Sequence, residues 1–388
     1  MYRGATGEYR VTTHGGEEVS AFVPKPLPPV PPLNLDGPLL KALEAANLAL
    51  GRLDGVSTLL PDKSLFLYHY VRKEAVLSSQ IEGTQSSLTD LLQHERGEVP
   101  GVPQDDVVEV SCYVAALEHG LRRLREDNFP LSNRLIREVH QVLLSSGRGS
   151  NKSPGEFRRS QNWVGGTRPG NADFVPPPHS EVEDCMASLE RFLHETEDGL
   201  PDLVRVGLAH VQIETIHPFL DGNGRVGRLL ITFLLCHAGL LQDPLLYLSL
   251  YLKQHRSDYY RLLNDVRLSG DWEAWLAFFL EGVRVTSEGA FSTAMSLTEM
   301  FRRDRERISS LGRPANSALR VHDVLMANPI FTIPEIAKMT GLSYPGASAG
   351  LNRLIGLGLV SEAPGDWRAR TFVYGQYLQT LIEGTEPL

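Results

Sequence analysis

Apolar and polar positions follow one another along most of this chain with the spacing of α-helices. From Leu39 onward, apolar residues recur three and four positions apart, which places them on one helix face and predicts that this face packs against a core. Stretches with this spacing predict helices over residues 39–50, 64–81, 104–126, 133–144, 182–197, 200–215, 229–238, 257–268 and 272–307. The fold class that this pattern indicates is mainly α.

The helical spacing stops over residues 156–178. Trp163–Gly166 and Phe174–Val175 are short strand-like pieces around a tip rich in glycine, proline and asparagine, which predicts a small β-hairpin inside the helical domain. Residues 1–35 are also weakly periodic and end in the proline-rich run 24–32. Because proline cannot donate a backbone hydrogen bond and favours polyproline II, we expect an extended strap here rather than a ligand for a proline-reading domain.

Gly312 and Pro314 interrupt the helical pattern, and a compact module follows them. Its expected elements are three helices and then two strands around a wing-like turn: helices over 318–327, 333–340 and 344–357, strands over 359–361 and 371–374, and the turn at Gly365–Asp366. This order is typical of a winged helix-turn-helix. A chain of 388 residues is long enough for two or three domains, and we expect three parts: an N-terminal region over 1–100, a core over 101–300 and a winged-helix-like domain over 313–388.

Composition and charge narrow the class of protein. With 42% hydrophobic and 22% charged residues, the chain is typical of globular proteins and unlike disordered or fibrous ones. The balance of 38 Lys and Arg against 47 Asp and Glu, net −9, makes the whole chain a poor non-specific ligand for nucleic acid. The densest apolar run, residues 229–241, is too short to span a bilayer. Three scattered cysteines and no visible secretory signal predict a cytoplasmic protein without membrane association.

One segment combines several chemical groups, the run His217–Arg228 (HPFLDGNGRVGR), which lies between two expected helices. Its glycines allow the backbone to bend and to approach a ligand closely. The N–H groups that begin the following helix attract anions, and phosphate is the usual one. Arg225 and Arg228 are three residues apart, so both guanidinium groups can reach one bound phosphate chain.

The same segment carries a carboxylate and an imidazole. Magnesium commonly sits on one carboxylate plus substrate phosphates, a role that Asp221 could fill. A histidine with an ordinary pKa near 6.5 can accept a proton at neutral pH, which suits His217 to act as a base. A base, a metal carboxylate and an anion cradle are together what the transfer of a phosphate-bearing group to a hydroxyl requires.

These twelve residues resemble the signature of the Fic family, H-x-F-x-[DE]-G-N-G-R-x-x-R, and match it at every fixed position. The resemblance covers roughly residues 10–285 and implies a Fic-type helical bundle with a β-hairpin flap. It also implies a protein adenylyltransferase, which uses ATP and Mg²⁺ to move AMP onto a Ser, Thr or Tyr hydroxyl and releases pyrophosphate. The phosphotransferase offshoot that resembles the Doc toxins has lysine where this chain has Gly224, so nucleotidyl transfer is favoured.

The resemblance assigns a role to each matching position. His217 deprotonates the target hydroxyl, Asp221 binds magnesium, and Phe219 anchors the loop in the core. The residues implied to bind ATP are Glu82, His217, Gly222, Asn223, Gly224, Arg225, Val226, Gly227, Arg228, Tyr251 and Tyr260. Within this set, Gly222–Arg225 hold the α- and β-phosphates and Arg228 the γ-phosphate. Tyr251 and Tyr260 are candidates for adenine contact, with packing into the core as the alternative.

An upstream segment resembles the inhibitory motif of the family, [ST]-x-x-x-E-[GN], with Ser78, Glu82 and Gly83 at its fixed positions. The resemblance implies that the Glu82 carboxylate pairs with Arg228 and takes the charge meant for the γ-phosphate, at a cost of several kcal/mol to break. Some relatives use this glutamate to remove AMP from the target, and the sequence leaves that reverse reaction open. Val164, Gly165 and Gly166 resemble the flap, which pairs with an extended target segment by strand addition.

The partners expected are a target protein with an exposed hydroxyl, the chain itself, and a second copy in a homodimer. DNA is not favoured, because residues 313–388 carry six positive and six negative side chains and the helix over 344–357 has Arg353 as its one cation. Target recruitment, dimer contact or packing suits this module better. The competing interpretations are a DNA-associated regulator whose Fic core senses nucleotide, and an enzyme that transfers UMP, GMP, phosphocholine or another phosphate group.

Overall fold

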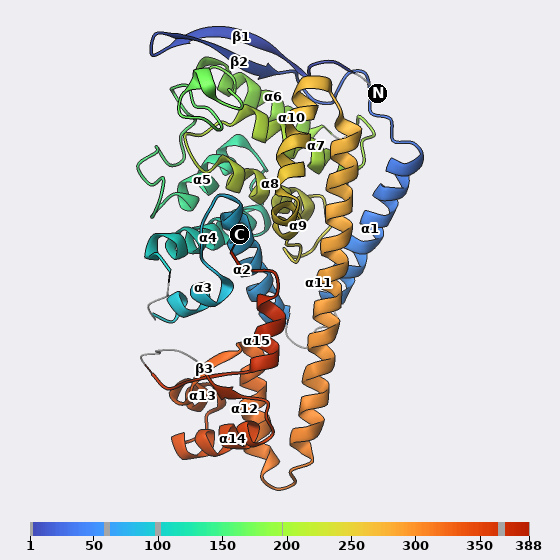
Figure 1. The fold of residues 1–388 in the computed structure, drawn as a ribbon. Helices are drawn as coiled ribbons and strands as arrows, with labels where there is room; N and C mark the ends of the chain where they lie inside the picture. Colours follow the sequence, from blue (N-terminus) through green and yellow to red (C-terminus); the bar gives the residue numbers. More distant parts are fainter. Residues whose placement is uncertain (1–2, 58–62, 98–101, 196, 364–368, 388) are drawn as a thin grey trace.

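The computed structural model describes residues 3–57, 63–97, 102–195, 197–363 and 369–387, and Figure 1 shows their arrangement. The mainly helical fold expected from the sequence is confirmed, and the described residues also form two small sheets. The α-helices are α1 Gly37–Ser57, α2 Lys63–Ile81, α3 Leu88–Glu95, α4 Gln104–Arg125, α5 Asn133–Leu143, α6 Val182–His194, α7 Asp202–Ile216, α8 Asn223–His237, α9 Ser249–Gln254, α10 Arg256–Ser269, α11 Trp272–Ser309, α12 Ala315–Ala327, α13 Ile333–Thr340, α14 Tyr344–Gly356 and α15 Gly375–Ile382.

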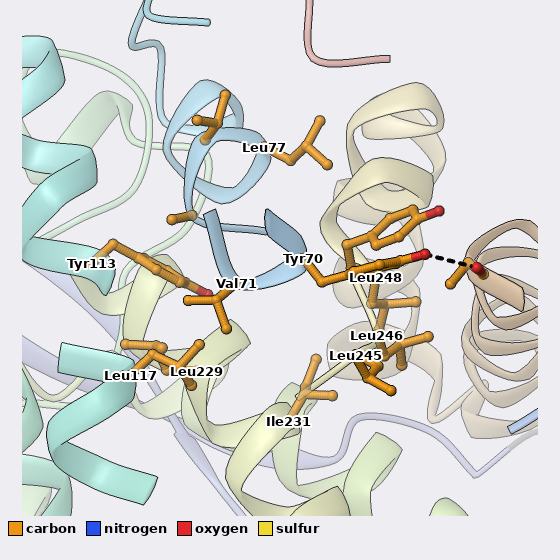
Figure 2. Packing of buried hydrophobic residues seen from close by; sticks show 14 of the residues in the cluster. Tyr70, Val71, Leu77, Tyr113, Leu117, Leu229, Ile231, Leu245, Leu246 and Leu248 are labelled. Atoms are coloured by element: carbon orange, nitrogen blue, oxygen red, sulfur yellow. Dashed lines mark hydrogen bonds between the residues drawn. The ribbon is translucent and has the colours of Figure 1, made fainter. Parts of the chain in front are cut away.

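Helix α2 lies in the interior of the core. Figure 2 shows Tyr70, Val71 and Leu77 of α2 surrounded by apolar side chains of α4, α8 and the segment before α9. The Tyr70 hydroxyl donates to the carbonyl of Ala290 on α11, at 2.8 Å. Because neighbouring elements cover α2 on several sides, packing fixes the position of its C-terminal turn, which carries the motif that resembles an inhibitory one.

Helix α11 is the longest element, with 38 residues. At 1.5 Å per residue it extends about 57 Å. The Asp271 side chain caps its first turn by accepting from the Ala274 N–H, at 3.2 Å. Helix α1 packs along α11, and the C-terminal end of α11 leads to the C-terminal module (Figure 1).

The N-terminal region differs from the extended strap expected over residues 1–35. Strands β1 (Gly7–His14) and β2 (Glu17–Pro24) form an antiparallel hairpin, so the strap expectation is wrong for these residues. Gly15 and Gly16 make the turn, with φ values of 58° and 86° that favour glycine. The Phe22 N–H donates to the carbonyl of Val175 at 2.9 Å, which joins the hairpin to the flap.

The predicted flap hairpin is present in reduced form. Val164 and Phe174 form one antiparallel bridge, and a 3₁₀ turn over Pro169–Asn171 occupies the tip. Gly165 and Gly166 both have positive φ, at 70° and 65°, where the chain turns away from the bridge. The flap is therefore a short, tightly turned segment rather than a pair of regular strands.

The C-terminal module has the expected helix order. Helices α13 and α14 lie at the predicted places, and a three-stranded sheet in the order β3-β5-β4 (Ile330–Thr332, Thr371–Val373, Ser361–Glu362) packs with them. The turn expected at Gly365–Asp366 lies outside the described residues. Strand β3 and helix α15 were not predicted. Helix α15 brings the chain back beside α2 and α11 (Figure 1).

Within the described ranges, no helix combines the length and apolar character that crossing a bilayer requires.

Candidate active site

The run His217–Arg228 forms a tight loop between two buried helices. Helix α7 ends at Ile216, and His217 turns the chain with a left-handed φ of 50°. Gly222, with φ of 77°, directly precedes α8. The first N–H groups of α8 have no acceptor within their own helix, so they are available to an anion at this end.

Asn223 closes the loop. Its Oδ1 accepts from the Phe219 N–H at 2.8 Å and its Nδ2 donates to the Phe219 carbonyl at 2.9 Å. Phe219 is fully buried, as expected, and stacks on the His140 ring with centroids 3.7 Å apart. The Asn223 side chain is thus committed to the loop, and its main-chain N–H is what remains for a ligand.

His140, on α5, supports the same loop and has no place in any motif. Its Nδ1 accepts from the Gly155 N–H at 2.9 Å, so its Nε2–H donates to the Asp221 carbonyl at 3.1 Å. Burial lowers the pKa of His140 to about 4, which keeps the ring neutral, and the bond from the Gly155 N–H to Nδ1 fixes this tautomer. Sequence reasoning missed His140 because it lies 77 residues before the loop, without a pattern that connects the two.

The His217 imidazole is half-buried at the mouth of the loop. Burial, with the nearby Arg158 charge, lowers the pKa of His217 to about 4, so the ring is neutral at pH 7. Its Nδ1 lies 3.4 Å from the Glu214 carbonyl, which assigns the ring proton to Nδ1. Nε2 is left as the atom that can accept a proton.

Asp221 fits a magnesium ion that keeps several waters. Its side chain is 33% exposed, its Oδ1 accepts from the Gly222 N–H at 2.6 Å, and the Arg225 guanidinium lies 3.8 Å away. Among the described residues, no group of three or more metal-binding side chains occurs. Magnesium is commonly held by one carboxylate plus substrate phosphates, so a single carboxylate beside a phosphate cradle suits it.

Arg225 points into the core. Its side chain is 1% exposed, and Nη1 lies 2.7 Å from Oε1 of Glu109 on α4, which is 2% exposed. Burial raises the pKa of Glu109, and the charges of Arg225 and Arg148 oppose that rise. Sequence reasoning missed Glu109. The expected contact of Arg225 with phosphate stays a prediction. Its observed partners are the carboxylates of Glu109 and, at 3.8 Å, Asp221.

Arg228 is held by the motif on α2. Its Nη2 donates to Glu82 Oε1 at 2.6 Å and to the Ser78 carbonyl at 3.0 Å, and its Nε donates to Ser78 Oγ at 2.8 Å. Burial alone would raise the pKa of Glu82, but the positive charge of Arg228 holds it below its ordinary value. The carboxylate is therefore ionised and paired at neutral pH.

The Glu82 carboxylate also lies against the first turn of α8. A Cβ placed on Gly224 would be 2.3 Å from Glu82 Oε1 and 3.1 Å from Arg228 Nη1. The position next to Gly224 is where the resemblance places phosphate oxygens. A carboxylate thus occupies the end of the helix that would receive a nucleotide.

The flap is tied to the same loop by Arg158 and Asn162. Arg158 Nε donates to the His217 carbonyl at 2.9 Å, and its Nη2 donates to Pro177 at 2.5 Å. Asn162 Nδ2 donates to the Phe219 carbonyl at 2.8 Å. These contacts join the segment that leads into Val164, Gly165 and Gly166 to the imidazole loop, and neither Arg158 nor Asn162 could be singled out from spacing alone.

The other predicted residues lie around this centre. Val226 and Gly227 are buried within α8, and Gly83 lies in the turn that follows α2, with a φ of 100°. Tyr251 packs between His255 and Phe278, at ring distances of 4.3 and 5.0 Å. Tyr260 is 41% exposed. The predicted adenine contacts of the two tyrosines stay predictions.

Family models and curated relatives match parts of this chain. The model described as Fic/DOC family N-terminal matches residues 40–122, and the Fic/DOC family model matches residues 130–235. Protein adenylyltransferase Fic of Aedes aegypti is 31% identical over 245 residues, 62% of this chain and 43% of that protein. Its counterpart in Culex quinquefasciatus is 32% identical over 204 residues, 52% and 38% of the two chains. The match thus spans less than half the length of these relatives.

Solved structures show the same fold. A Fic family protein from Desulfovibrio desulfuricans G20 superposes with a TM-score of 0.54 at 20% identity, over 88% of this chain and 97% of that one. A Fic domain containing signaling protein from Bacteroides thetaiotaomicron VPI-5482 gives 0.51 at 20% identity, over 64% and 95%. At this identity the likeness concerns the fold.

Proposed function

We propose that this chain is an autoinhibited protein adenylyltransferase, because its residues 40–122 match the Fic/DOC family N-terminal model and its residues 130–235 match the Fic/DOC family model. It moves AMP from ATP to a Ser, Thr or Tyr hydroxyl of a target protein, and to hydroxyls of its own chain. The observation that carries the proposal is the meeting of His217, Asp221 and the start of α8 in one loop, with the Glu82 carboxylate lying on it. The names of the relatives favour AMP as the transferred group.

The reaction divides among groups of this chain. The neutral His217 Nε2 accepts the proton of the target hydroxyl, whose oxygen attacks the α-phosphorus. A bond forms between that oxygen and phosphorus, the bond from the α-phosphorus to the bridging oxygen breaks, and pyrophosphate leaves with the electron pair. The N–H groups at the start of α8 stabilise the charge on the phosphate oxygens. Magnesium at Asp221, when bound, would neutralise charge on the phosphates.

The pair between Glu82 and Arg228 acts as a brake. Arg228 is 2% exposed, and its guanidinium already donates to Glu82 and twice to Ser78. A triphosphate would have to displace the Glu82 carboxylate, which is 30% exposed, from a buried guanidinium. Removing one member of a fully buried pair costs about 3–5 kcal/mol, which is an upper bound here because the phosphate then pairs with Arg228. Each 1.4 kcal/mol is a factor of about ten, so the pair is strong enough to keep transfer slow.

The test compares the wild-type chain with Glu82→Gly in the presence of Mg²⁺ and ATP labelled at the α- or the γ-phosphate. We expect Glu82→Gly to label itself or a lysate protein at least about tenfold faster than wild type, and from α-labelled ATP only. The double variant Glu82→Gly with His217→Ala should show no labelling. Glu82→Gln, which keeps the side-chain length and removes the charge, should lie between the wild type and the glycine variant.

Two results would contradict the proposal. Label arriving from the γ-phosphate would indicate a kinase, and equal rates for the wild type and Glu82→Gly would remove the brake. A further experiment tests for the reverse reaction by incubating AMP-labelled target with unlabelled wild type or Glu82→Gly. Release of AMP by the wild type and not by Glu82→Gly would assign AMP removal to Glu82.

A further inference from the structure

The chain returns to its inhibitory motif after α15. The segment Glu383–Pro387, which we call the tail, lies against α2 (Figure 1). Three of its backbone carbonyls accept hydrogen bonds from side chains of the core. Lys73 Nζ donates to Glu383 at 2.6 Å, Gln80 Nε2 donates to Thr385 at 2.8 Å, and Lys253 Nζ donates to Glu386.

Gln80 is the centre of these contacts, and it lies inside the motif between Ser78 and Glu82. Its side chain is 2% exposed. Its Nε2 also donates to the Ser86 carbonyl at 2.9 Å, and its Oε1 accepts from Lys253 Nζ at 2.7 Å. One amide thus connects the last turn of α2, the loop after it, α9 and the tail.

The tail is buried where it makes these contacts. Thr385 is 2% exposed, and Lys253, which contacts both Gln80 and Glu386, is 7% exposed. A buried donor that loses its acceptor costs about 1–3 kcal/mol, more for a charged group. Withdrawal of the tail would remove an acceptor from Gln80 and another from Lys253.

The turn that carries Glu82 depends on its neighbours. Glu82 N–H bonds the Ser79 carbonyl and Gly83 N–H bonds the Gln80 carbonyl, both at 3.0 Å, so the end of α2 is a tightened last turn. Helix ends are the parts of a helix that open most easily. Glu82 reaches Arg228 only while this turn is formed.

We propose that the tail is a clamp that holds the turn Ser78–Gly83 in its inhibitory position, with Gln80 as the positioning residue. The C-terminal module then acts on the brake through the segment that follows α15, and displacement of that segment releases Glu82 from Arg228. The clamp rests on the proposed function for its effect on AMP transfer, and on the contacts alone for its effect on the turn.

The first test removes the tail together with the last residue, 383–388, and measures hydrogen exchange of the amides over 78–86. We expect exchange there to become at least about tenfold faster, since the turn loses its buried support. Unchanged exchange at these amides would overturn the clamp, whatever the chain catalyses. Thermal unfolding of the same sample checks that the rest of the chain stays folded.

The second test measures self-labelling from α-labelled ATP in four chains: wild type, the tail deletion, Glu82→Gly and the two changes together. We expect the deletion to move the rate toward that of Glu82→Gly, and to add nothing when Glu82 is already glycine. Fast labelling by Glu82→Gly with a wild-type rate for the deletion would reject the clamp only. No labelling by Glu82→Gly would reject the proposed function, and hydrogen exchange would still decide the clamp.

Point variants guard against a deletion that disturbs folding. Gln80→Ala removes the amide and should raise both the exchange over 78–86 and the labelling rate. Gln376→Ala is the matched control, because Gln376 is exposed on α15 and contacts Arg303 rather than α2. If Gln80→Ala and Gln376→Ala behave alike, the clamp is wrong.

Discussion

At the scale of single residues, the backbone conformation of His217 affects the properties of its imidazole, the proton acceptor of the site. His217 takes a left-handed φ of 50° at the end of α7, which a non-glycine residue rarely adopts. That turn puts Nδ1 toward the Glu214 carbonyl and leaves the ring beside the Arg158 charge. The conformation therefore helps to set the tautomer of the imidazole, whose pKa is lowered first by burial and then by the Arg158 charge.

This lowered pKa predicts an unusual pH profile. With a pKa of about 4, His217 stays deprotonated down to acidic pH, whereas an ordinary histidine would lose half of its base form near pH 6.5. In Glu82→Gly, loss of a nearby negative charge shifts the pKa further in the same direction. We expect kcat/KM of that variant to change less than about twofold between pH 6 and 8. A fall by half near pH 6.5 would contradict the assignment.

Gly227 makes a second prediction at this scale. Replacing glycine by alanine inside a helix usually stabilises a protein by about 1 kcal/mol. Here a Cβ on Gly227 would be 2.4 Å from Oε1 of Glu214, a carboxylate that is itself 8% exposed. We expect Gly227→Ala to lower the free energy of unfolding by about 1–3 kcal/mol, measured by urea denaturation.

A double-mutant cycle provides the control for Gly227→Ala. Glu214→Ala removes the carboxylate, so adding Gly227→Ala to it should cost little or should stabilise. If Gly227→Ala destabilises the chain equally with and without Glu214, the contact between them is not the cause.

At the scale of elements, the flap and the motif loop act as one unit because Arg158 joins them. Its guanidinium donates to carbonyls of His217, Ser160 and Pro177. Lysine carries a similar charge but lacks the planar fork that reaches several acceptors at once. We expect Arg158→Lys, in the Glu82→Gly background, to lower kcat by about 10–100-fold with a smaller change in KM for ATP, since misplacement of the imidazole affects the chemical step.

The neighbouring Arg159 offers the matched control for Arg158→Lys. Its side chain is 89% exposed and lies 3.9 Å from Glu156, so Arg159→Lys should leave kcat unchanged. Equal losses from the two variants would show that positive charge near the flap matters, rather than the tie between flap and loop.

The sequence predicts those elements whose signal is local. Most helices with a regular apolar face lie within a few residues of their predicted ends, but α1 continues seven residues past its predicted end at 50 and α8 begins six residues before its predicted start at 229. The hairpin β1–β2 was missed although it carries a signal, Gly15–Gly16 between β-branched runs. Helix α3 was also missed although Ser87 and Asp90 form a capping box at its start.

Within the candidate site, too, contacts that follow from local motifs were predicted, and contacts that depend on packing between distant elements were not. The expected place of Glu82 beside Arg228 follows from two motifs and agrees with the contact of 2.6 Å. Glu109, His140 and Arg158 could not be predicted, because their meeting with the loop depends on how α4, α5 and the flap pack in space. The burial of Arg225 has the same origin, since spacing places it on the α8 face without saying what lies opposite.

At the scale of the whole molecule, charge argues against DNA as the partner of the C-terminal module. Arg353, the one cation of α14, donates to Ser317 Oγ at 2.7 Å, and Arg370 pairs with Glu362 at 3.1 Å. We expect a labelled duplex to bind no tighter than the non-specific range of about 10⁻⁴–10⁻⁶ M, measured by anisotropy at low and physiological salt. Arg353→Ala should not change that affinity. If the wild type bound the duplex with nanomolar affinity and Arg353→Ala lost it, the conclusion that DNA is not the partner would be wrong.

The long helix α11 carries the chain away from the core, and α15 with the tail brings it back. Arg96, just after α3, adds a further contact by donating to the Ile330 carbonyl and to Glu335, and the Tyr374 hydroxyl donates to Asp304 of α11 at 2.6 Å. The two parts of the chain on either side of Gly312 are thus joined by more than the peptide bond. If a protease site is placed at Gly312 and the chain is cut there, we expect the two fragments to elute together from a sizing column. Fragments that separate only in denaturant would show that this protein stays assembled with a cut backbone.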